Sequence, residues 1–368
     1  MLQARDTILV PAERLHAFVV ACMERVGATS DDAAAVADAL LAADLRGVDS
    51  HGVARLRRYV NGIRNGAIAA KPSVTILHDG PATAVVDAGN GLGQPAALTA
   101  MRLAIAKAEQ IGIGMVVARR SNHFGIAGYY AMLALEHGMV GVVTSNASPQ
   151  VAPTFAAEPM YGTNPIAIAM PTGGPCPFVL DMATSTAARG RMEQMRREGK
   201  PIPPGWAIDA DGATTVDTDN VISGLMGRQG HALLPLGGAG ETFGGYKGYG
   251  LGLFADLLCG PLAGSGWGRH VYGPNGANLG HGFLAMRVDC FRPREEFLAE
   301  SEQLLREIRA AKKVPDQERI YIPGEKEAEE TIRRKRDGIP LLPVVHDDLG
   351  AIAQEIGISF EWPAAFTR

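Results

Sequence analysis

The N-terminal part of the chain has the hydrophobic spacing of two helices. Between residues 15 and 26, apolar side chains recur every three or four positions, which places them on one face of a helix that ends at Gly27. Thr29 is suited to cap a second helix, whose apolar positions continue to about Gly47. Residues 49–59, DSHGVARLRRY, are therefore expected to form a glycine-flanked corner between two helices.

The middle of the chain changes to short runs rich in β-branched residues. These runs are SVTILHD, TAVVDAG, GMVVARR, VGVVTSN, NPIAIAMP, FVLDMAT and GFLAMRVDCF, separated by helical or glycine-rich pieces. The alternation predicts a mixed α/β core. From residue 294 the pattern is charged and helical again. We expect residues 1–75 and 294–368 to form one helical domain, and residues 76–293 to form a sheet-containing domain.

Composition and charge narrow the class of partner. The chain has 368 residues, 35 Lys and Arg against 39 Asp and Glu, and a formal net charge of −4. Without a clustered positive excess it has no general attraction for nucleic acid or an anionic membrane, so a small molecule is the expected partner. No apolar run is long enough for a signal peptide or a membrane span, and we expect a cytoplasmic protein.

The cysteines and histidines indicate neither a disulfide nor a metal centre. The four cysteines are far apart, show no CxxC pairing and sit among apolar neighbours, which predicts buried free thiols in a reducing compartment. The nine histidines never pair at HxxH, HxxxH or HExxH spacing. We therefore expect no zinc site.

A glycine-rich turn imitates a dinucleotide-binding motif. In DAGNGLGQPAAL, Gly91, Gly93 and Ala96 fit the GxGxxA pattern after a strand-like run. That motif needs free backbone amides at a helix N-terminus, and Pro95 removes one of them. No acidic residue ends a second strand about 20 residues on, where a ribose hydroxyl would be bound. We interpret the segment as a turn.

The segment RRSNHFGIAGYY follows an apolar strand, where α/β folds keep polar working groups. Its His123 lies between Asn122 and the flexible Gly125, and a helix expected to start at Ile126 would point its positive end toward the imidazole. His123 can donate a proton, hold an anionic cofactor group, or serve the structure alone.

Three further segments offer polar groups near strand or helix ends. Small polar residues suited to a carboxamide or a ribose, or simply to turns, are Ser145, Asn146, Ser148, Thr163 and Asn164. Asp181 ends the run FVLD, where its carboxylate can accept from a ribose hydroxyl or cap the next helix. In the glycine-rich stretch at residues 237–251, Lys247 can meet a phosphate or remain in solvent.

The corner at residues 49–59 carries the most specific chemistry. Ser50 lies in no GxSxG elbow, so a serine hydrolase is not indicated. His51 can exchange a proton near neutral pH, with the Ser50 hydroxyl to orient it, and Arg55 follows four residues later on the same face of a starting helix. An acid beside a guanidinium suits reduction of a 2-oxo acid, since the arginine holds the carboxylate and the acid protonates the carbonyl oxygen. Tyr59, one turn beyond, is expected to reach the substrate, whereas Arg57 and Arg58 are expected to point away.

Several segments together resemble a known family, the second type of malate/L-lactate dehydrogenases. This family also includes ureidoglycolate, sulfolactate and diketogulonate enzymes and a cyclic-imine reductase. The matching segments, in the family's order, are DSHGVARL, RRSNHFGIAGYY, YGTNPIAIAMP, VLDMATS, GGYKGYGLGLFADLL and IYIPGEKE. They lie between residues 49 and 327, which is most of the chain.

The resemblance implies an NAD(P)-dependent oxidoreductase, usually a homodimer. Its fold is α/β but not Rossmann, with a largely antiparallel-sheet cofactor domain and a helical domain built from both chain ends. In such enzymes the serine and histidine of SHG, here Ser50 and His51, form the proton-donating pair, and the arginine at Arg55 binds the substrate carboxylate. The histidine at His123 lies at the nicotinamide and is itself the acid–base group in some members.

Further cofactor contacts follow from the same resemblance. Asp181, Met182 and Ala183 match the family's DMA segment, and Lys247 matches a cofactor-contacting lysine. Where some members have a cofactor-binding serine this chain has Ala147, so the contact is expected to pass to Ser148 or to backbone.

We therefore expect reversible hydride transfer between NAD or NADP and a small 2-hydroxy or 2-oxo acid, such as malate or lactate. Two alternatives stay open, namely reduction of a cyclic imine and a catalytically silent small-molecule binding protein. The sequence does not decide between the two cofactors, name the acid, or choose between His51 and His123 as the proton donor.

Overall fold

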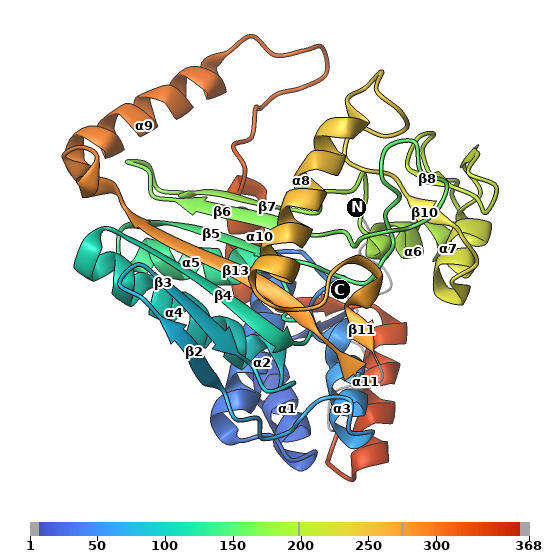
Figure 1. Ribbon diagram of the computed structural model, residues 1–368. Coiled ribbons are helices and arrows are strands. Elements are labelled where there is room, and N and C mark those ends of the chain that lie inside the picture. The colour runs from blue at the N-terminus through green and yellow to red at the C-terminus, as the bar shows by residue number, and fades with distance from the viewer. Residues whose placement is uncertain (1–6, 198, 274–275, 361–368) are drawn as a thin grey trace.

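Helices from both ends of the chain pack around one apolar core. The computed structural model describes residues 7–197, 199–273 and 276–360. The N-terminal strand β1 (Ile8–Val10) pairs antiparallel with β14 (Ile339–Leu341), which ties the two chain ends together. The helices around this pair are α1 (Ala12–Arg25), α2 (Ser30–Leu45), α3 (Leu56–Arg64), α10 (Glu325–Asp337) and α11 (Pro343–Ile356). Figure 1 shows the blue N-terminal and red C-terminal helices side by side.

The helix starts follow from local sequence. The Thr29 hydroxyl accepts the backbone N–H of Asp32 at 3.2 Å, so Thr29 caps α2 as predicted. The predicted apolar face of α1 is buried at Leu15, Val19 and Met23, where it packs against α2 and α11.

The central sheet has seven strands in the order β2-β3-β4-β13-β5-β6-β7. Its strands are β2 (Thr75–Asp79), β3 (Thr83–Asp87), β4 (Ile113–Ser121), β5 (Met139–Ser145), β6 (Ile166–Met170), β7 (Phe178–Met182) and β13 (Leu279–Arg287). Only β3 and β4 are parallel, and every other neighbouring pair is antiparallel. The expectation of a non-Rossmann, largely antiparallel sheet joined to helices from both chain ends is confirmed.

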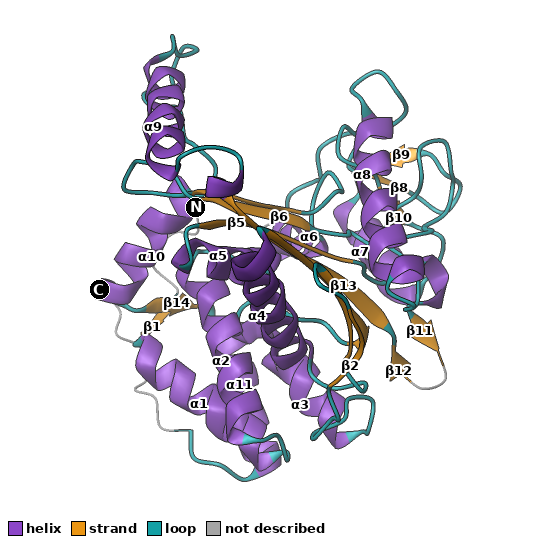
Figure 2. Cartoon of the chain, turned by 60° about the vertical axis from the view of Figure 1, so that its left-hand side comes forward, coloured by secondary structure: helices purple, strands orange, loops and turns teal. Residues whose placement is uncertain are grey.

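Both faces of the sheet are covered. On one face lie α4 (Gly93–Ile111) and α5 (Ala127–Glu136), whose buried alanines let the helices approach the strands closely. On the other lie α8 (Gly245–Leu257) and the π-helical turn η2 (Leu258–Leu262), which contact β4, β5 and β13 (Figure 2).

A small lobe between residues 185 and 240 was not predicted, because its strands are two residues long and show no period. It contains α6 (Arg189–Arg197), α7 (Thr218–Gly227), β8 (Ala207–Ile208), β9 (Thr214–Thr215) and β10 (Ala232–Leu233). Its own apolar core includes Met192, Ile202 and Ile222. The remaining elements are η1 (Val53–Arg55), η3 (Gly268–His270), β11 (Tyr272–Gly273), β12 (Gly276–Ala277), η4 (Val288–Cys290) and α9 (Arg294–Ala310).

Two details of the sequence interpretation are wrong. Cys22 and Cys259 are buried free thiols as expected, but Cys290 is exposed in a 3-10 turn. The corner after α2 is also not the start of an α-helix, because residues 53–55 form the 3-10 turn η1 and α3 begins only at Leu56.

Candidate active site

A cavity of about 420 Å³ lies where the corner after α2 meets the ends of the central strands. Its size is within the range of small-molecule sites. The helical part contributes Arg46, Val48, Ser50, His51 and residues 321–324, 326 and 327, and the sheet part contributes Gly125, Ile126, Ala127, Thr163, Pro165 and residues 179–183. Segments from five of the six matching motifs thus surround one cavity.

The corner that carries His51 is held from below by Asp44 of α2. The Asp44 carboxylate is almost fully buried, and its Oδ2 accepts the backbone N–H of Val53 at 2.8 Å. A Cβ atom at Gly52 would lie 1.8 Å from Asp44 Oδ1, so only glycine lets the chain pass over the carboxylate here. The turn after His51 is therefore fixed by a buried acid that sequence patterns gave no reason to single out.

Ser50, His51 and Arg55 lie together, although not by helical spacing. The Ser50 Oγ lies 2.9 Å from Nδ1 of His51, as expected for an orienting hydroxyl. The Arg55 Nε donates to the Ser50 carbonyl at 2.6 Å, which bends the guanidinium back toward the serine. Arg55 makes no ion pair with a carboxylate in the described part of the chain, so its charge is available to a ligand.

His123 lies beside His51. The two imidazole rings stack with centroids 5.7 Å apart and planes 20° from parallel. Tyr59 is fully buried, and its hydroxyl lies 2.7 Å from Nδ1 of His123. Tyr59 was expected to reach the substrate, which stays a prediction, and its hydroxyl lies against His123.

Positive charge surrounds the histidine pair. Burial, followed by Arg55, Arg58 and Arg189, lowers the pKa of His51 from 6.5 to about 4. Burial and the same cationic surroundings hold the pKa of His123 well below its usual value. Arg58 was expected to point away, yet it lies close enough to act on both rings while its guanidinium donates to the Tyr272 hydroxyl at 2.8 Å. Both imidazoles are therefore neutral near pH 7, and the positive charge of the arginines around them attracts anions.

Asp181 closes the floor of the cavity at the end of β7. Its Oδ2 accepts the backbone N–H of Gly128 at 2.7 Å in the first turn of α5, and its exposed surface faces the cavity. The surrounding cavity walls desolvate this carboxyl although it stays open to the cavity, which raises its pKa to about 6, and the Gly128 N–H and then Arg46 oppose the rise. Asp181 therefore holds the start of α5, an earlier helix rather than the next one that its position suggested, and it also lines the cavity, where a role as acceptor for a ribose stays a prediction.

The other expected cofactor contacts divide into two groups. Thr163, Met182 and Ala183 line the cavity. Asn164 and Ser148 do not line it. Asn164 is fully buried, with its Oδ1 accepting the N–H of Ala147 and its Nδ2 donating to the Gly252 carbonyl. Ser148 accepts from Gln150 at 3.3 Å.

Lys247 lies in the first turn of α8 and is exposed, outside the residues that line the cavity.

The segment that fits GxGxxA, from Gly91 to Ala96, has a packing role. A Cβ atom at Gly93 would lie 2.2 Å from the Asn122 carbonyl oxygen, so the start of α4 presses on the backbone that carries His123.

Four side chains near the site were missed by sequence reasoning. Arg46 lines the cavity and forms no ion pair within the described residues. Arg189 adds charge to His51 from α6. Gln94 is fully buried and neither of its amide atoms has a hydrogen-bond partner among the described residues. His281 is fully buried in β13, where its ring stacks on Phe124 at 4.4 Å. None lies in a spacing pattern, because distant segments bring them to the site.

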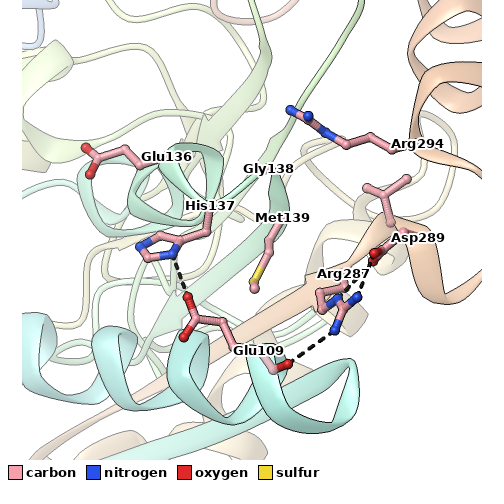
Figure 3. A pocket seen from close by; sticks show the side chains of 9 residues that line it. Glu109, Glu136, His137, Gly138, Met139, Arg287, Asp289 and Arg294 are labelled. Carbon is pink, nitrogen blue, oxygen red and sulfur yellow. Dashed lines mark hydrogen bonds and ion pairs between the residues drawn. The ribbon is translucent and has the colours of Figure 1, made fainter.

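A second depression of similar size, about 440 Å³, lies at the opposite end of the strands β4 and β13 (Figure 3). Four of its charged or titratable side chains form two pairs. His137 Nδ1 lies 2.8 Å from Glu109 Oε1, and Arg287 Nη2 lies 2.6 Å from Asp289 Oδ2. It is an ion-pair cluster at the surface, and we assign no chemistry to it.

Two kinds of site are not found in residues 7–197, 199–273 and 276–360. No group of three or more His, Cys, Asp or Glu side chains there could hold a metal ion. No helix of those ranges is long and apolar enough to cross a bilayer.

Comparison with known proteins places the chain among dehydrogenases. The family model described as malate/L-lactate dehydrogenase matches residues 10–350. The malate dehydrogenase of Pyrococcus abyssi (strain GE5 / Orsay) is 46% identical over 353 residues, which cover 95% of this chain and 96% of that protein. The L-sulfolactate dehydrogenase of Methanocaldococcus jannaschii is 37% identical over 358 residues, 96% of this chain and 99% of that protein.

Solved structures agree with the sequence relatives. The crystal structure of malate dehydrogenase from Entamoeba histolytica has a TM-score of 0.93 and 35% identity, and it covers 97% of this chain and 100% of that chain. Names of relatives at 32% identity specify NAD(+) in one case and NADP(+) in another. Since the relatives above are named for dehydrogenation of hydroxy acids, the cyclic-imine alternative is not favoured.

Proposed function

The chain belongs to the malate/L-lactate dehydrogenase family, and from that membership we propose that its cavity oxidises a small 2-hydroxy acid, with His51 as the proton-transfer group. It is an NAD(P)-dependent dehydrogenase acting on a CH–OH group, as its named relatives are. The residue roles below are our assignment.

One observation carries the assignment, namely that His51 and Arg55 meet at Ser50. The Ser50 hydroxyl contacts the His51 imidazole at 2.9 Å, and the Ser50 carbonyl holds Arg55 Nε at 2.6 Å. A 2-hydroxy acid has its carboxylate on the carbon next to the reacting CH–OH. A cation and a base anchored to the same residue match that short separation.

The cavity residues suit the cofactor. The Asp181 carboxylate is an acceptor for ribose hydroxyls, and Arg46 is a cation at the cavity wall without an ion-pair partner in the described chain. Apolar atoms of Ile126, Met182 and Ala183 line the wall between them. When bound there, the nicotinamide accepts or supplies a hydride.

The protein's own steps are binding and proton movement. Arg55 binds the substrate carboxylate, and the neutral His51 imidazole takes the hydroxyl proton as the C–H bond transfers its hydride. The Ser50 oxygen can accept from His51 Nδ1, which leaves Nε2 with a lone pair for that proton. In the reverse direction the same nitrogen returns the proton to the carbonyl oxygen.

We further propose that dianionic acids such as malate are preferred to lactate. Three arginines, Arg55, Arg58 and Arg189, lower the pKa of His51. The Glu193 carboxylate lies near the same arginines and pairs with Arg189 at 3.0 Å. The excess positive charge favours a substrate with two negative groups. This preference is in keeping with the names of the malate and sulfolactate relatives.

A substrate panel tests the function. L-malate, L-lactate, 3-sulfolactate and ureidoglycolate would each be incubated with NAD+ and with NADP+, and the absorbance at 340 nm followed; a cyclic imino acid with NADPH completes the panel. We expect turnover with hydroxy acids and a higher kcat/KM for the dianions. Measurable cofactor binding without turnover of any acid would instead favour a silent binding protein.

Homodimer formation and a cytoplasmic location are part of this proposal. Helix α8 and the turn η2 expose a row of large apolar side chains, which is typical of an interface. These are Tyr246, Leu251, Leu253, Phe254, Leu257 and Leu262. Sedimentation equilibrium of the full chain should give twice the monomer mass, and Phe254→Glu should reduce it.

A further inference from the structure

Two hydrogen bonds converge on one nitrogen of His123. The backbone N–H of Gly125 points at Nδ1 from 3.4 Å, and the Tyr59 hydroxyl lies 2.7 Å from the same atom. A backbone N–H has a proton to donate and no lone pair to accept one, so Nδ1 must be the acceptor. The Tyr59 hydroxyl then also donates to Nδ1, and the proton of the neutral ring is on Nε2.

The surroundings of Tyr59 support this direction of donation. Once its proton points at His123, the phenol oxygen is free to accept. Gln94 acts on this phenol and is fully buried, with neither amide atom hydrogen-bonded in the described chain, so its NH₂ group has a proton to donate to the phenol oxygen. Burial raises the pKa of Tyr59 to about 12, and Arg58, Arg55 and then Gln94 oppose the rise, so the hydroxyl keeps its proton near pH 7.

Close packing at the start of α4 determines the position of Gln94. It follows Gly93 at the start of α4, where a Cβ atom at Gly93 would lie 2.6 Å from the His123 carbonyl oxygen. The backbone that carries His123 and the helix that carries Gln94 are thus packed directly together. Gln94, Tyr59 and His123 form a chain of groups whose order is set by close packing.

We propose that Gly125 and Tyr59 fix His123 in the tautomer with its proton on Nε2, so that His123 donates a hydrogen bond to the reacting oxygen while His51 alone transfers the proton. Nε2 of His123 makes no hydrogen bond within the described residues and is not a buried atom, so its proton has no partner there, although His123 stands beside His51 and not among the residues that line the 420 Å³ cavity. A nitrogen that already carries a proton cannot take the hydroxyl proton of the substrate. His123 is therefore a donor to the oxygen on which negative charge develops, and Tyr59 is a positioning residue.

The Nδ1 atoms of the two histidines have different hydrogen-bond neighbours. At His51 the neighbour is the Ser50 hydroxyl, which can accept a proton and leave Nε2 basic. At His123 the neighbours include a group that can only donate. The catalytic part of this inference rests on the proposed function, but the tautomer itself follows from geometry alone.

NMR measures the tautomer of the His123 ring directly. Two-bond ¹H–¹⁵N correlation spectra of the full chain, labelled with ¹⁵N-histidine at pH 7, distinguish the protonated from the unprotonated ring nitrogen; His123→Gln assigns the signals. We expect His123 with the proton on Nε2. A proton on Nδ1, or a doubly protonated ring, would overturn the proposal. This arm needs no turnover, so it stays decisive even if the proposed activity fails.

Tyr59→Phe tests the positioning role. We expect a mixture of His123 tautomers and a fall in kcat of about tenfold, with KM for the hydroxy acid little changed, because one hydrogen bond to the ring is lost. Tyr129→Phe on α5 is the control for removal of a phenol hydroxyl. If Tyr59→Phe lowers kcat while the ring signals of His123 stay unchanged, Tyr59 does not act through the His123 tautomer and the proposal fails. If that variant does not fold, the spectrum of the unaltered chain decides.

Discussion

The Asp181 carboxylate joins the end of β7 to the first turn of α5 by accepting the backbone N–H of Gly128 at 2.7 Å. Its Oδ2 accepts the hydrogen bond from the helix, its Oδ1 accepts none from the described residues, and the residue lines the cavity. A single acid thereby couples the position of a helix N-terminus to the place where we expect a ribose.

This double role separates two substitutions. In Asp181→Asn the amide oxygen still accepts from Gly128, but the charged acceptor is lost, and we expect the Kd for NADH to rise about tenfold or more. In Asp181→Ala the cap is lost as well, which should lower the free energy of unfolding by about 1 kcal/mol. Protein fluorescence quenching by NADH gives the first quantity and urea unfolding the second. Equal NADH affinity in all three proteins would remove Asp181 from the cofactor site.

For His51 the expected effect is on turnover. His51→Gln removes the base, and general acid–base catalysis typically contributes about 10² to 10⁴-fold, so kcat should fall on that scale. NADH binding should persist, since Asp181 and Arg46 are untouched. His137→Gln, at the ion-pair cluster at the opposite end of the strands, is the matched control and should retain full activity. Near-full turnover of His51→Gln would show that another group transfers the proton.

Arg55→Lys keeps the charge but removes the planar guanidinium and its bond to the Ser50 carbonyl. We expect KM for the hydroxy acid to rise and kcat/KM to fall about 100-fold, because a bidentate carboxylate contact cannot be replaced by an ammonium. Arg57→Lys is a close control, since Arg57 pairs with Asp348 and Glu355 on α11. A change in NADH affinity with an unaltered KM would place Arg55 at the cofactor instead.

The strands and most helices could be predicted from periodicity, since β4, β5 and β13 are long apolar runs and α1 has a clear buried face. Strand order could not, because β13 lies between β4 and β5 although about 130 residues separate it from β5, as their pairing register shows. Such pairing depends on tertiary packing that no local pattern records.

The same distinction applies to the site. His51 and His123 stand in readable motifs, whereas Arg189 acts on His51 from α6 and Gln94 acts on Tyr59 from α4. Whether 1–75 with 294–368 and 76–293 are separate domains stays a prediction. The structure shows only that the cavity draws on residues from both ranges.

The arginines around His51 predict a pH effect. Because positive neighbours disfavour the imidazolium, removing one should raise the pKa of His51 from about 4 toward its ordinary value. In hydroxy-acid oxidation the neutral form is the base, so kcat/KM of the unaltered enzyme should show no His51 limb between pH 5.5 and 8. Burial is the largest cause and Arg189 the smallest of the three arginines, so Arg189→Gln should shift the acidic limb upward from about pH 4 without abolishing it. Arg196→Gln, which breaks the exposed pair with Asp219, should not shift it. Identical profiles for all three proteins would show that Arg189 does not act on His51.

The buried Asp44 beneath the corner predicts a pH-dependent stability. Burial raises the pKa of this carboxyl from 3.8 to about 8, so between these values the folded chain holds a proton that the unfolded chain has lost. The free energy of unfolding must therefore fall as pH rises through this window, with a contribution from Asp44 of up to about 1.4 kcal/mol per pH unit. Asp44→Asn keeps an acceptor for the Val53 N–H and abolishes the titration. Its stability relative to the unaltered chain, measured by urea unfolding at pH 5, 6.5 and 8, should increase with pH. Parallel curves would mean that Asp44 is ionised throughout and that the corner rests on a buried charge.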